Sequence, residues 1–178
     1  MHRLIICLFA LLAACAPRGT ADGGVYRAAA SPIYSNAAFD PGRLDGTWNQ
    51  VAAFAGPSQN GCSPGAAEFS ATSARATSGG MRVRYALCLS GRDVAGAGTI
   101  ATTGPGRFAV SGKDGIGQDW WVLWVDEGYR TMAIGNPSGT FGFILNRGHA
   151  LPSDRLKAAT EVFDFNGYDT GKLVVLRD

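Results

Sequence analysis

Between residues 46 and 147 the chain consists of short apolar runs separated by glycine-rich or polar segments. The 25 glycines are spread along the 178 residues, a pattern that favours strands and tight turns over a helical bundle. The clearest alternation runs from Arg82 to Tyr85, where two arginines share one face of a strand and two apolar side chains share the other. Strands are expected at 46–54, 66–71, 81–89, 95–102, 107–111, 120–125, 129–135 and 140–147.

One segment after these runs has the pattern of a helix. Ser153 can cap its N-terminus, and Asn166-Gly167 is a typical helix end. Three apolar residues share one face of this helix: Leu156, Ala159 and Phe163. A closing strand is expected at 172–177. Eight antiparallel strands can close around one small ligand. We therefore expect an all-β fold, an eight-stranded antiparallel up-and-down β-barrel with one C-terminal helix packed outside and a final short strand.

The N-terminus has the pattern of an export signal. A basic start, Met1-His2-Arg3, precedes an apolar run from Leu4 to Leu12 that is too short to span a bilayer. Leu12-Ala13-Ala14-Cys15 resembles the lipobox of bacterial lipoproteins, in which the cysteine becomes the first mature residue and carries acyl chains. The same alanines would also suit an ordinary signal peptidase. The lipobox reading predicts a signal peptide over 1–14 and lipidation of Cys15.

The residues that follow suggest where the protein is held. Ala16, rather than Asp, resembles the sorting signal for the outer membrane, so the expected location is the cell outer membrane, lipid-anchored and facing the periplasm. Residues 15–38 are rich in Ala, Gly, Ser and Pro without periodicity. We expect them to form the lipidated N-terminus and a flexible tether, with the barrel domain over 39–178.

Two cysteines remain once the signal is removed and Cys15 carries lipid. An oxidising compartment predicts a disulfide between Cys62 and Cys88. The midpoint between them lies in a loop-like stretch flanked by strand-like runs, so they would face each other across an antiparallel pair. Two unpaired buried thiols are the alternative. Redox or metal roles are less expected, since neither a CxxC motif nor a nearby histidine is present.

Charge and motif content argue against several classes of function. The net charge is +2, with Lys and Arg scattered, so neither nucleic acid nor a polybasic membrane contact is indicated. His149 is the one histidine after the signal and is expected at the surface. Asp126 and Glu127 are adjacent and would point apart on a strand. With no HExxH or Gly-x-Ser-x-Gly motif, we expect no catalytic residues, no metal, no cofactor and no enzymatic activity.

Three sequence blocks follow the lipobox in order. They are Phe39-Asp40-Pro41 through Gly46-Thr47-Trp48 and Val51-Ala52-Ala53-Phe54, then Asp126-Glu127-Gly128-Tyr129-Arg130, then Ile144-Leu145-Asn146-Arg147. In this order they resemble the motifs of the lipocalins, and specifically of bacterial outer-membrane lipocalin lipoproteins. The resemblance covers about residues 39–178. Asn49 stands where family members often have an aromatic residue, and 62–112 match weakly.

The resemblance implies structural roles for the motif residues, which include Gly46. Trp48 would plug the closed end of the barrel, and Arg147 would lie across its ring in a cation–π contact worth about 1–2 kcal/mol. Asp126 and Tyr129 would shape the turn beside it. The alternative for Arg147 is an anionic ligand head group.

The resemblance also implies which side chains face the interior. On the last strands these cavity-lining candidates are Trp120, Val122, Trp124, Ala133, Phe141, Phe143 and Leu145, with Gly135 beside them. The small residues Ala133, Gly135 and Gly142 favour space being left for a ligand. The alternative is a barrel filled by its own aromatic side chains. Arg82 and Arg84 are expected to be solvated, or else to face inward and bind a carboxylate or phosphate.

Two functions of different classes are consistent with these residues. The first is a membrane-anchored carrier of a small hydrophobic molecule (a fatty acid, lysophospholipid or similar lipid) for transport, storage or envelope maintenance. The second is a filled barrel that binds proteins through its loops, as a hydrolase inhibitor or an envelope assembly factor. The expected partners are a hydrophobic ligand and the membrane, and the sequence does not indicate an oligomeric state.

Overall fold

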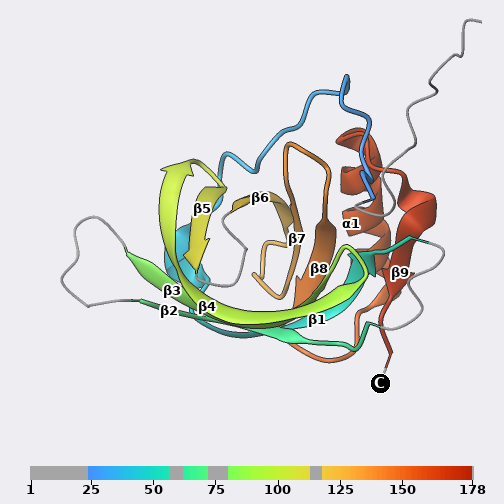
Figure 1. Ribbon diagram of the computed structural model, residues 1–178. Helices are drawn as coiled ribbons and strands as arrows, with labels where there is room; N and C mark the ends of the chain where they lie inside the picture. The colour runs from blue at the N-terminus through green and yellow to red at the C-terminus, as the bar shows by residue number, and fades with distance from the viewer. Residues whose placement is uncertain (1–23, 57–61, 72–79, 113–117, 178) are drawn as a thin grey trace, which may run out of the picture.

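Antiparallel strands follow one another along the chain and close into a barrel (Figure 1). The structure, a computed structural model, describes residues 24–56, 62–71, 80–112 and 118–177. Each strand pairs with the next, and β1 closes the ring by pairing with both β8 and β2. In the described residues the eight barrel strands are β1 (Gly46–Phe54), β2 (Ala66–Ala71), β3 (Met81–Leu89), β4 (Arg92–Gly104), β5 (Arg107–Gly112), β6 (Gln118–Val125), β7 (Thr131–Gly135) and β8 (Gly142–Asn146). The expected fold class is therefore confirmed.

The first three strands begin and end where the sequence predicted, whereas β4 starts three residues earlier than expected. A two-residue turn explains the difference. Ser90 and Gly91 have φ angles of 52° and 71°, as a tight hairpin turn of the primed type requires. Leu89 therefore pairs directly with Arg92, and β4 begins at once.

A helix, α1 (Ser153–Phe165), packs outside the barrel. Ser153 is its first residue and not its cap: Pro152 holds the capping position, and no side chain accepts a capping hydrogen bond there. The helix ends as expected, with Gly167 at a φ of 79° just beyond it. Ala159 and Phe163 are buried, and Leu156 packs against the same cluster. Within the described residues, no helix has the length and apolar character needed to cross a membrane.

The last strand completes one edge of β1. A short 3-10 helix, η2 (Thr170–Lys172), leads into β9 (Leu173–Val175). The first half of β1 pairs with β2, and the second half of the same edge pairs with β9. The strand expected at 172–177 is present but shorter.

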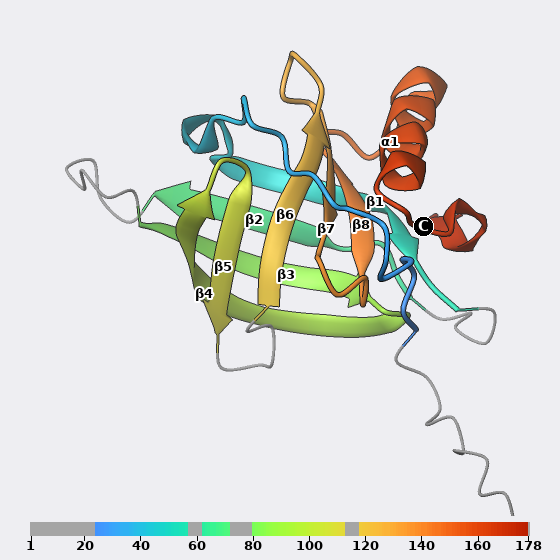
Figure 2. The same ribbon diagram turned by 90° about the horizontal axis from the view of Figure 1, so that it is seen from above.

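Residues 24–38 form an ordered strap, and a second 3-10 helix, η1 (Pro41–Arg43), follows it. The Tyr26 N–H donates to the Gly139 carbonyl at 2.7 Å, and the Asn36 N–H donates to the Val122 carbonyl at 2.8 Å. Figure 2 shows this blue segment crossing β6. The expectation of a free tether is wrong for residues 24–38, because backbone pairing and burial of Tyr26 fix them to the barrel. Residues 1–23, including Cys15, lie outside the described residues.

Two apolar clusters lie on opposite sides of the barrel wall. The helix-side cluster lies between the outer faces of the strands, the strap and α1. It consists of Tyr26, Val51, Ala52, Phe54, Leu123, Ala133, Ile144, Ala159, Phe163 and Tyr168. The interior cluster fills the inside of the barrel. It consists of Phe39, Leu44, Trp48, Ala53, Ala67, Phe69, Val83, Tyr85, Leu87, Cys88, Leu89, Ile100, Phe108, Val110, Trp120, Val122, Tyr129, Met132, Ile134, Phe141, Phe143 and Leu145.

Candidate functional site

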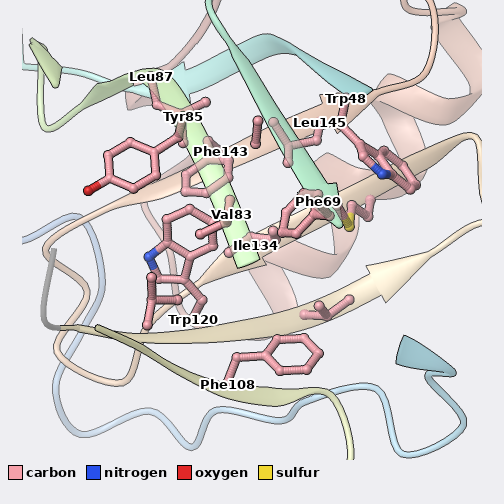
Figure 3. Close-up of a cluster of buried hydrophobic side chains, with 14 of the residues drawn as sticks. Trp48, Phe69, Val83, Tyr85, Leu87, Phe108, Trp120, Ile134, Phe143 and Leu145 are labelled. Carbon is pink, nitrogen blue, oxygen red and sulfur yellow. The ribbon is translucent and has the colours of Figure 1, made fainter. Parts of the chain in front are cut away.

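The wall of the barrel interior is made of apolar and aromatic side chains (Figure 3). The Trp120 ring lies 5.3 Å from the Phe143 ring and 6.2 Å from the Tyr85 ring, between centroids. Five of the seven predicted lining residues belong to this interior cluster: Trp120, Val122, Phe141, Phe143 and Leu145. Strands β6 and β8 therefore supply the aromatic wall that the sequence indicated.

Trp124 and Ala133 do not line the interior, and this part of the prediction is wrong. A β-bulge between Val122 and Trp124 shifts the register of β6 by one residue. Beyond the bulge, Trp124 pairs with Ala133, and both pack into the helix-side cluster. The inward positions of β7 are Met132 and Ile134 instead. The run from Trp120 to Val125 is apolar throughout, so it carries no periodicity from which the bulge could be found.

Gly135 and Gly142, which were expected to leave space for a ligand, make space for aromatic side chains of the helix-side cluster instead. A Cβ added to Gly142 would lie 2.8 Å from Phe54 Cδ2 and 3.1 Å from Phe163 Cε1. At Gly135 it would collide with the hydroxyl of Tyr168. These glycines allow three outer aromatic rings to approach the sheet closely.

One buried polar side chain that the sequence reasoning missed connects two strands of the wall. The Gln50 amide donates to the Cys88 carbonyl at 2.8 Å and accepts from the Cys88 N–H at 2.7 Å. Strand β2 begins only at Ala66, opposite Ala86, so it does not reach Cys88. The Gln50 side chain thus supplies the pair of hydrogen bonds that a strand would have made.

The predicted disulfide between Cys62 and Cys88 is present, with the two Cα atoms 5.4 Å apart. Cys88 lies on β3, but Cys62 precedes β2 by four residues. The bond therefore joins the β1–β2 connection to β3. The expectation that it would link two paired strands is wrong.

The indole N–H of Trp120 is a polar group in the otherwise apolar surroundings of the interior cluster. Trp120 is 1% exposed, and its Nε1 has no hydrogen-bond partner among the described residues. In Figure 3 this nitrogen lies on the side of the cluster that is farthest from Trp48. Tyr85 directs its hydroxyl to the same side.

The end of the barrel near Trp48 is closed by the motif residues. The Arg147 guanidinium lies 4.0 Å from the centroid of the Trp48 ring, which is the contact that the family resemblance implied. Its Nη2 also donates to the Arg43 carbonyl at 3.0 Å. Gly46 has a φ of 96°, and a Cβ there would lie 3.0 Å from Arg147. Burial lowers the pKa of Arg147, and nearby Asp45 opposes this shift.

The turn between β6 and β7 completes this closed end. Asp126 accepts hydrogen bonds from the N–H groups of Arg130 and Thr131, each at 2.6 Å. Burial would raise the pKa of Asp126, but these hydrogen bonds and the Arg130 guanidinium lower it overall. Tyr129, at a φ of 52°, accepts a hydrogen bond from the Asp40 N–H at 2.7 Å. Both residues shape the turn, as the resemblance implied.

The charged candidates do not contribute to the interior. Arg82 and Arg84 are exposed on the outer face of β3, in agreement with the solvated alternative, and His149 is exposed beyond β8. In the described ranges no group of three or more His, Cys, Asp or Glu side chains could hold a metal ion.

Three cavities lined by described residues lie at strand ends and edges. The first, of ≈ 530 Å³, lies where the edge of β1 passes from β2 to β9, between Gln50, Gly65 and Leu176. The second, of ≈ 280 Å³, lies beside Pro64 and Val94, and the third, of ≈ 380 Å³, beside Asn136. The linings of these three cavities do not include Trp120, Phe143 or Leu145.

Several solved structures share this architecture. Lobster apocrustacyanin A1 matches with a TM-score of 0.57 and 15% identity, over 77% of this chain and 78% of that one. The siderocalin Ex-FABP matches with a TM-score of 0.55 and 14% identity, over 76% and 94% of the two chains. H1 crustacyanin from the lobster Homarus americanus matches with a TM-score of 0.57 and 15% identity, over 78% of this chain and 79% of that one. At identities this low the likeness concerns the fold.

Comparisons of sequence give the family. A search of the curated proteins finds no significant match. The family model for a lipocalin-like domain matches residues 39–178, which include the whole barrel, α1 and β9. The motif blocks, the closed eight-stranded barrel and this match agree, and the chain therefore belongs to the lipocalin-like family.

Proposed function

We propose that this protein carries a small hydrophobic molecule inside its barrel. The observation that carries the proposal is the interior wall, in which Trp120, Phe141 and Phe143 form an aromatic surface inside a lipocalin-like barrel. Members of this family are generally binding or carrier proteins rather than enzymes. The siderocalin among the similar structures is described as acting through dual ligand specificities.

The driving term of such binding is the burial of apolar ligand surface. Each methylene group transferred from water to an apolar wall contributes about 0.8 kcal/mol. A lipid with a long alkyl chain, such as a fatty acid or lysophospholipid, thus gains affinity with each carbon atom that enters the barrel. Affinity should stop rising once the chain outgrows the interior.

The second part of the proposal concerns location. Cys15 in Leu12-Ala13-Ala14-Cys15 would carry acyl chains that hold the protein on the outer membrane, facing the periplasm. The described part of the strap starts at Gly24, so eight residues, 16–23, lie between the lipid-bearing Cys15 and that point. A carrier held this close to a bilayer would exchange lipids with it for transport, storage or envelope maintenance.

Native mass spectrometry tests the carrier role. The strap, the strands and α1 all lie after residue 23, so the chain from residue 16 keeps every contact described above. This chain should co-purify with a lipid, which organic extraction identifies, or take up added palmitate. A clean apo mass with no uptake of fatty acid or lysophospholipid contradicts the carrier role. Radiolabelled palmitate incorporation that is lost in Cys15→Ser tests the anchor separately.

One observation favours the second function, a protein-binding barrel. The interior rings contact one another directly, with Phe141 stacked 5.8 Å from Phe143, and the three described cavities lie away from them. A barrel filled in this way would act through its surface as an inhibitor of a hydrolase or as an assembly factor of the envelope. The apo result above would select this function.

A further inference from the structure

Trp120 Nε1 is a buried hydrogen-bond donor of the interior cluster for which the described part of the chain supplies no acceptor. Trp120 is almost completely buried, and its Nε1 donates to no acceptor. Buried donors are almost always satisfied, because an unmade hydrogen bond costs the whole desolvation of the donor. Trp48 shows the normal case in the same barrel: its Nε1 donates to the Leu44 carbonyl at 2.8 Å.

The surroundings of Trp120 determine what kind of acceptor could approach it. Among the described residues the buried charged side chains are Arg27 and Asp126, and neither belongs to the interior cluster. Arg27 donates to carbonyls of Asn166 and Pro137 outside the barrel, and Asp126 lies in the closed-end turn. A carboxylate buried beside Trp120 would meet no cation in the described wall, and an unpaired buried charge is strongly unfavourable. A neutral oxygen carries no such penalty.

We propose that Trp120 Nε1 donates a hydrogen bond to a neutral oxygen of the ligand, so that the interior selects uncharged amphiphiles such as esters, ketones or alcohols over free carboxylates. This inference rests on the proposed carrier function and narrows its ligand class. The rings of Phe143 and Phe141, 5.3 and 6.4 Å from Trp120 between centroids, hold the indole in place. The nitrogen lies on the side of the cluster away from the closed end, where a ligand would approach.

A matched set of probes with the same alkyl chain tests this selection. Dodecane, methyl laurate and laurate differ only in the end group, and their affinities are compared by competition against a fluorescent apolar probe. The chain from residue 16 should bind methyl laurate about tenfold more tightly than dodecane, the effect of one buried hydrogen bond. It should also bind methyl laurate more tightly than laurate, whose charge would be buried without a cation. Trp120→Phe should lower the affinity for methyl laurate about tenfold more than that for dodecane, because only the ester loses a hydrogen bond. Trp121→Phe is the control, because Trp121 lies outside the barrel with Arg107 over its ring at 4.2 Å.

The indole N–H signals in a ¹⁵N-labelled sample give a direct readout. The chain has four tryptophans, and the signal absent from Trp120→Phe identifies Trp120. Methyl laurate should move this signal downfield, as a new hydrogen bond does, while the Trp48 signal stays in place. A melting temperature and near-UV circular dichroism spectrum close to wild type confirm that Trp120→Phe is folded.

Each contrary result has a distinct meaning. Equal affinities for dodecane and methyl laurate, or equal losses for both in Trp120→Phe, overturn the role of the indole and leave the carrier function intact. If laurate binds more tightly than methyl laurate and dodecane, the proposed preference for uncharged ligands is overturned. Binding of none of the three probes overturns the carrier function and this inference together.

Discussion

Arg147 lies over the Trp48 ring, 4.0 Å from its centroid, and the same indole donates from its edge to the Leu44 carbonyl at 2.8 Å. Arg147 Nη2 reaches the Leu44 carbonyl as well, at 3.3 Å. The face and the edge of one tryptophan, a guanidinium and the segment that precedes β1 thus form a single unit. Among the described residues, no carboxylate forms an ion pair with Arg147 in this unit.

Replacing Arg147 tests how much this unit stabilises the fold. Arg147→Lys keeps the positive charge but loses the planar fork that donates to the Arg43 and Thr47 carbonyls. We expect the free energy of unfolding to fall by about 1–2 kcal/mol in urea titrations, the size of a partly buried cation–π contact. Arg84→Lys, on the exposed outer face of β3, is the matched control and should change little. An Arg147→Lys variant as stable as wild type would show that the planar guanidinium and its hydrogen bonds add nothing beyond the positive charge.

Reduction of the Cys62–Cys88 bond tests the opposite end of the barrel. The two cysteines are 26 residues apart, and closing a loop of this size restricts the unfolded chain by about 3 kcal/mol. The melting temperature should therefore fall in reductant and in Cys62→Ser/Cys88→Ser. Reductant should have no effect on the double variant, which serves as its control. An unchanged melting temperature in the reduced wild type would show that the disulfide does not contribute to the stability of the fold.

These two ends show what the sequence could and could not predict. The closed-end residues were found because Trp48, Asp126 and Arg147 lie in motif blocks whose residue types and order are specific. The strands β1 to β3 were found to the residue because their alternation ends at glycine, proline or polar turns. Gln50 was missed because an amide that completes a strand edge has no sequence signature.

The strap and the bulge were missed for a different reason. Residues 24–38 lack periodicity because they pair through isolated backbone hydrogen bonds and not as a regular element. The bulge in β6 inverts the faces of Trp124 and Val125 within an apolar run, and a one-residue shift exchanges every side chain between the two faces. Both features depend on contacts with distant segments, which local composition does not record.

The lowered pKa of Asp126 leads to a prediction of how the stability of the fold depends on pH. Its folded pKa is lowered from the usual 3.8, so the stability it contributes is present above the unfolded pKa and is lost as pH falls through the folded pKa. Asp126→Asn should destabilise the protein at pH 7 by about 1–3 kcal/mol, because the Arg130 and Thr131 N–H groups lose a charged acceptor. The difference from wild type should shrink by pH 3, as measured by denaturant titration at each pH. A difference that stays constant from pH 7 to pH 3 would contradict this account, and Asp119→Asn on the exposed start of β6 is the control.

A substitution at Gly142 tests whether the helix side of the barrel wall and its interior have separate roles. A Cβ at this position would lie 2.8 Å from Phe54 Cδ2, on the side of α1, while its neighbours Phe141 and Phe143 face the interior. Gly142→Ala should therefore lower the free energy of unfolding by about 1–3 kcal/mol through overpacking of the helix-side cluster. Ligand affinity, measured on protein that is still folded, should stay at the wild-type value, because no interior atom changes. Phe143→Ala is the converse variant. It removes aromatic surface inside the barrel and should therefore lower the affinity for apolar probes. If Gly142→Ala reduced ligand affinity as strongly as Phe143→Ala while the fold stayed intact, the division of the wall into an interior and a helix side would not describe how this protein binds its ligand.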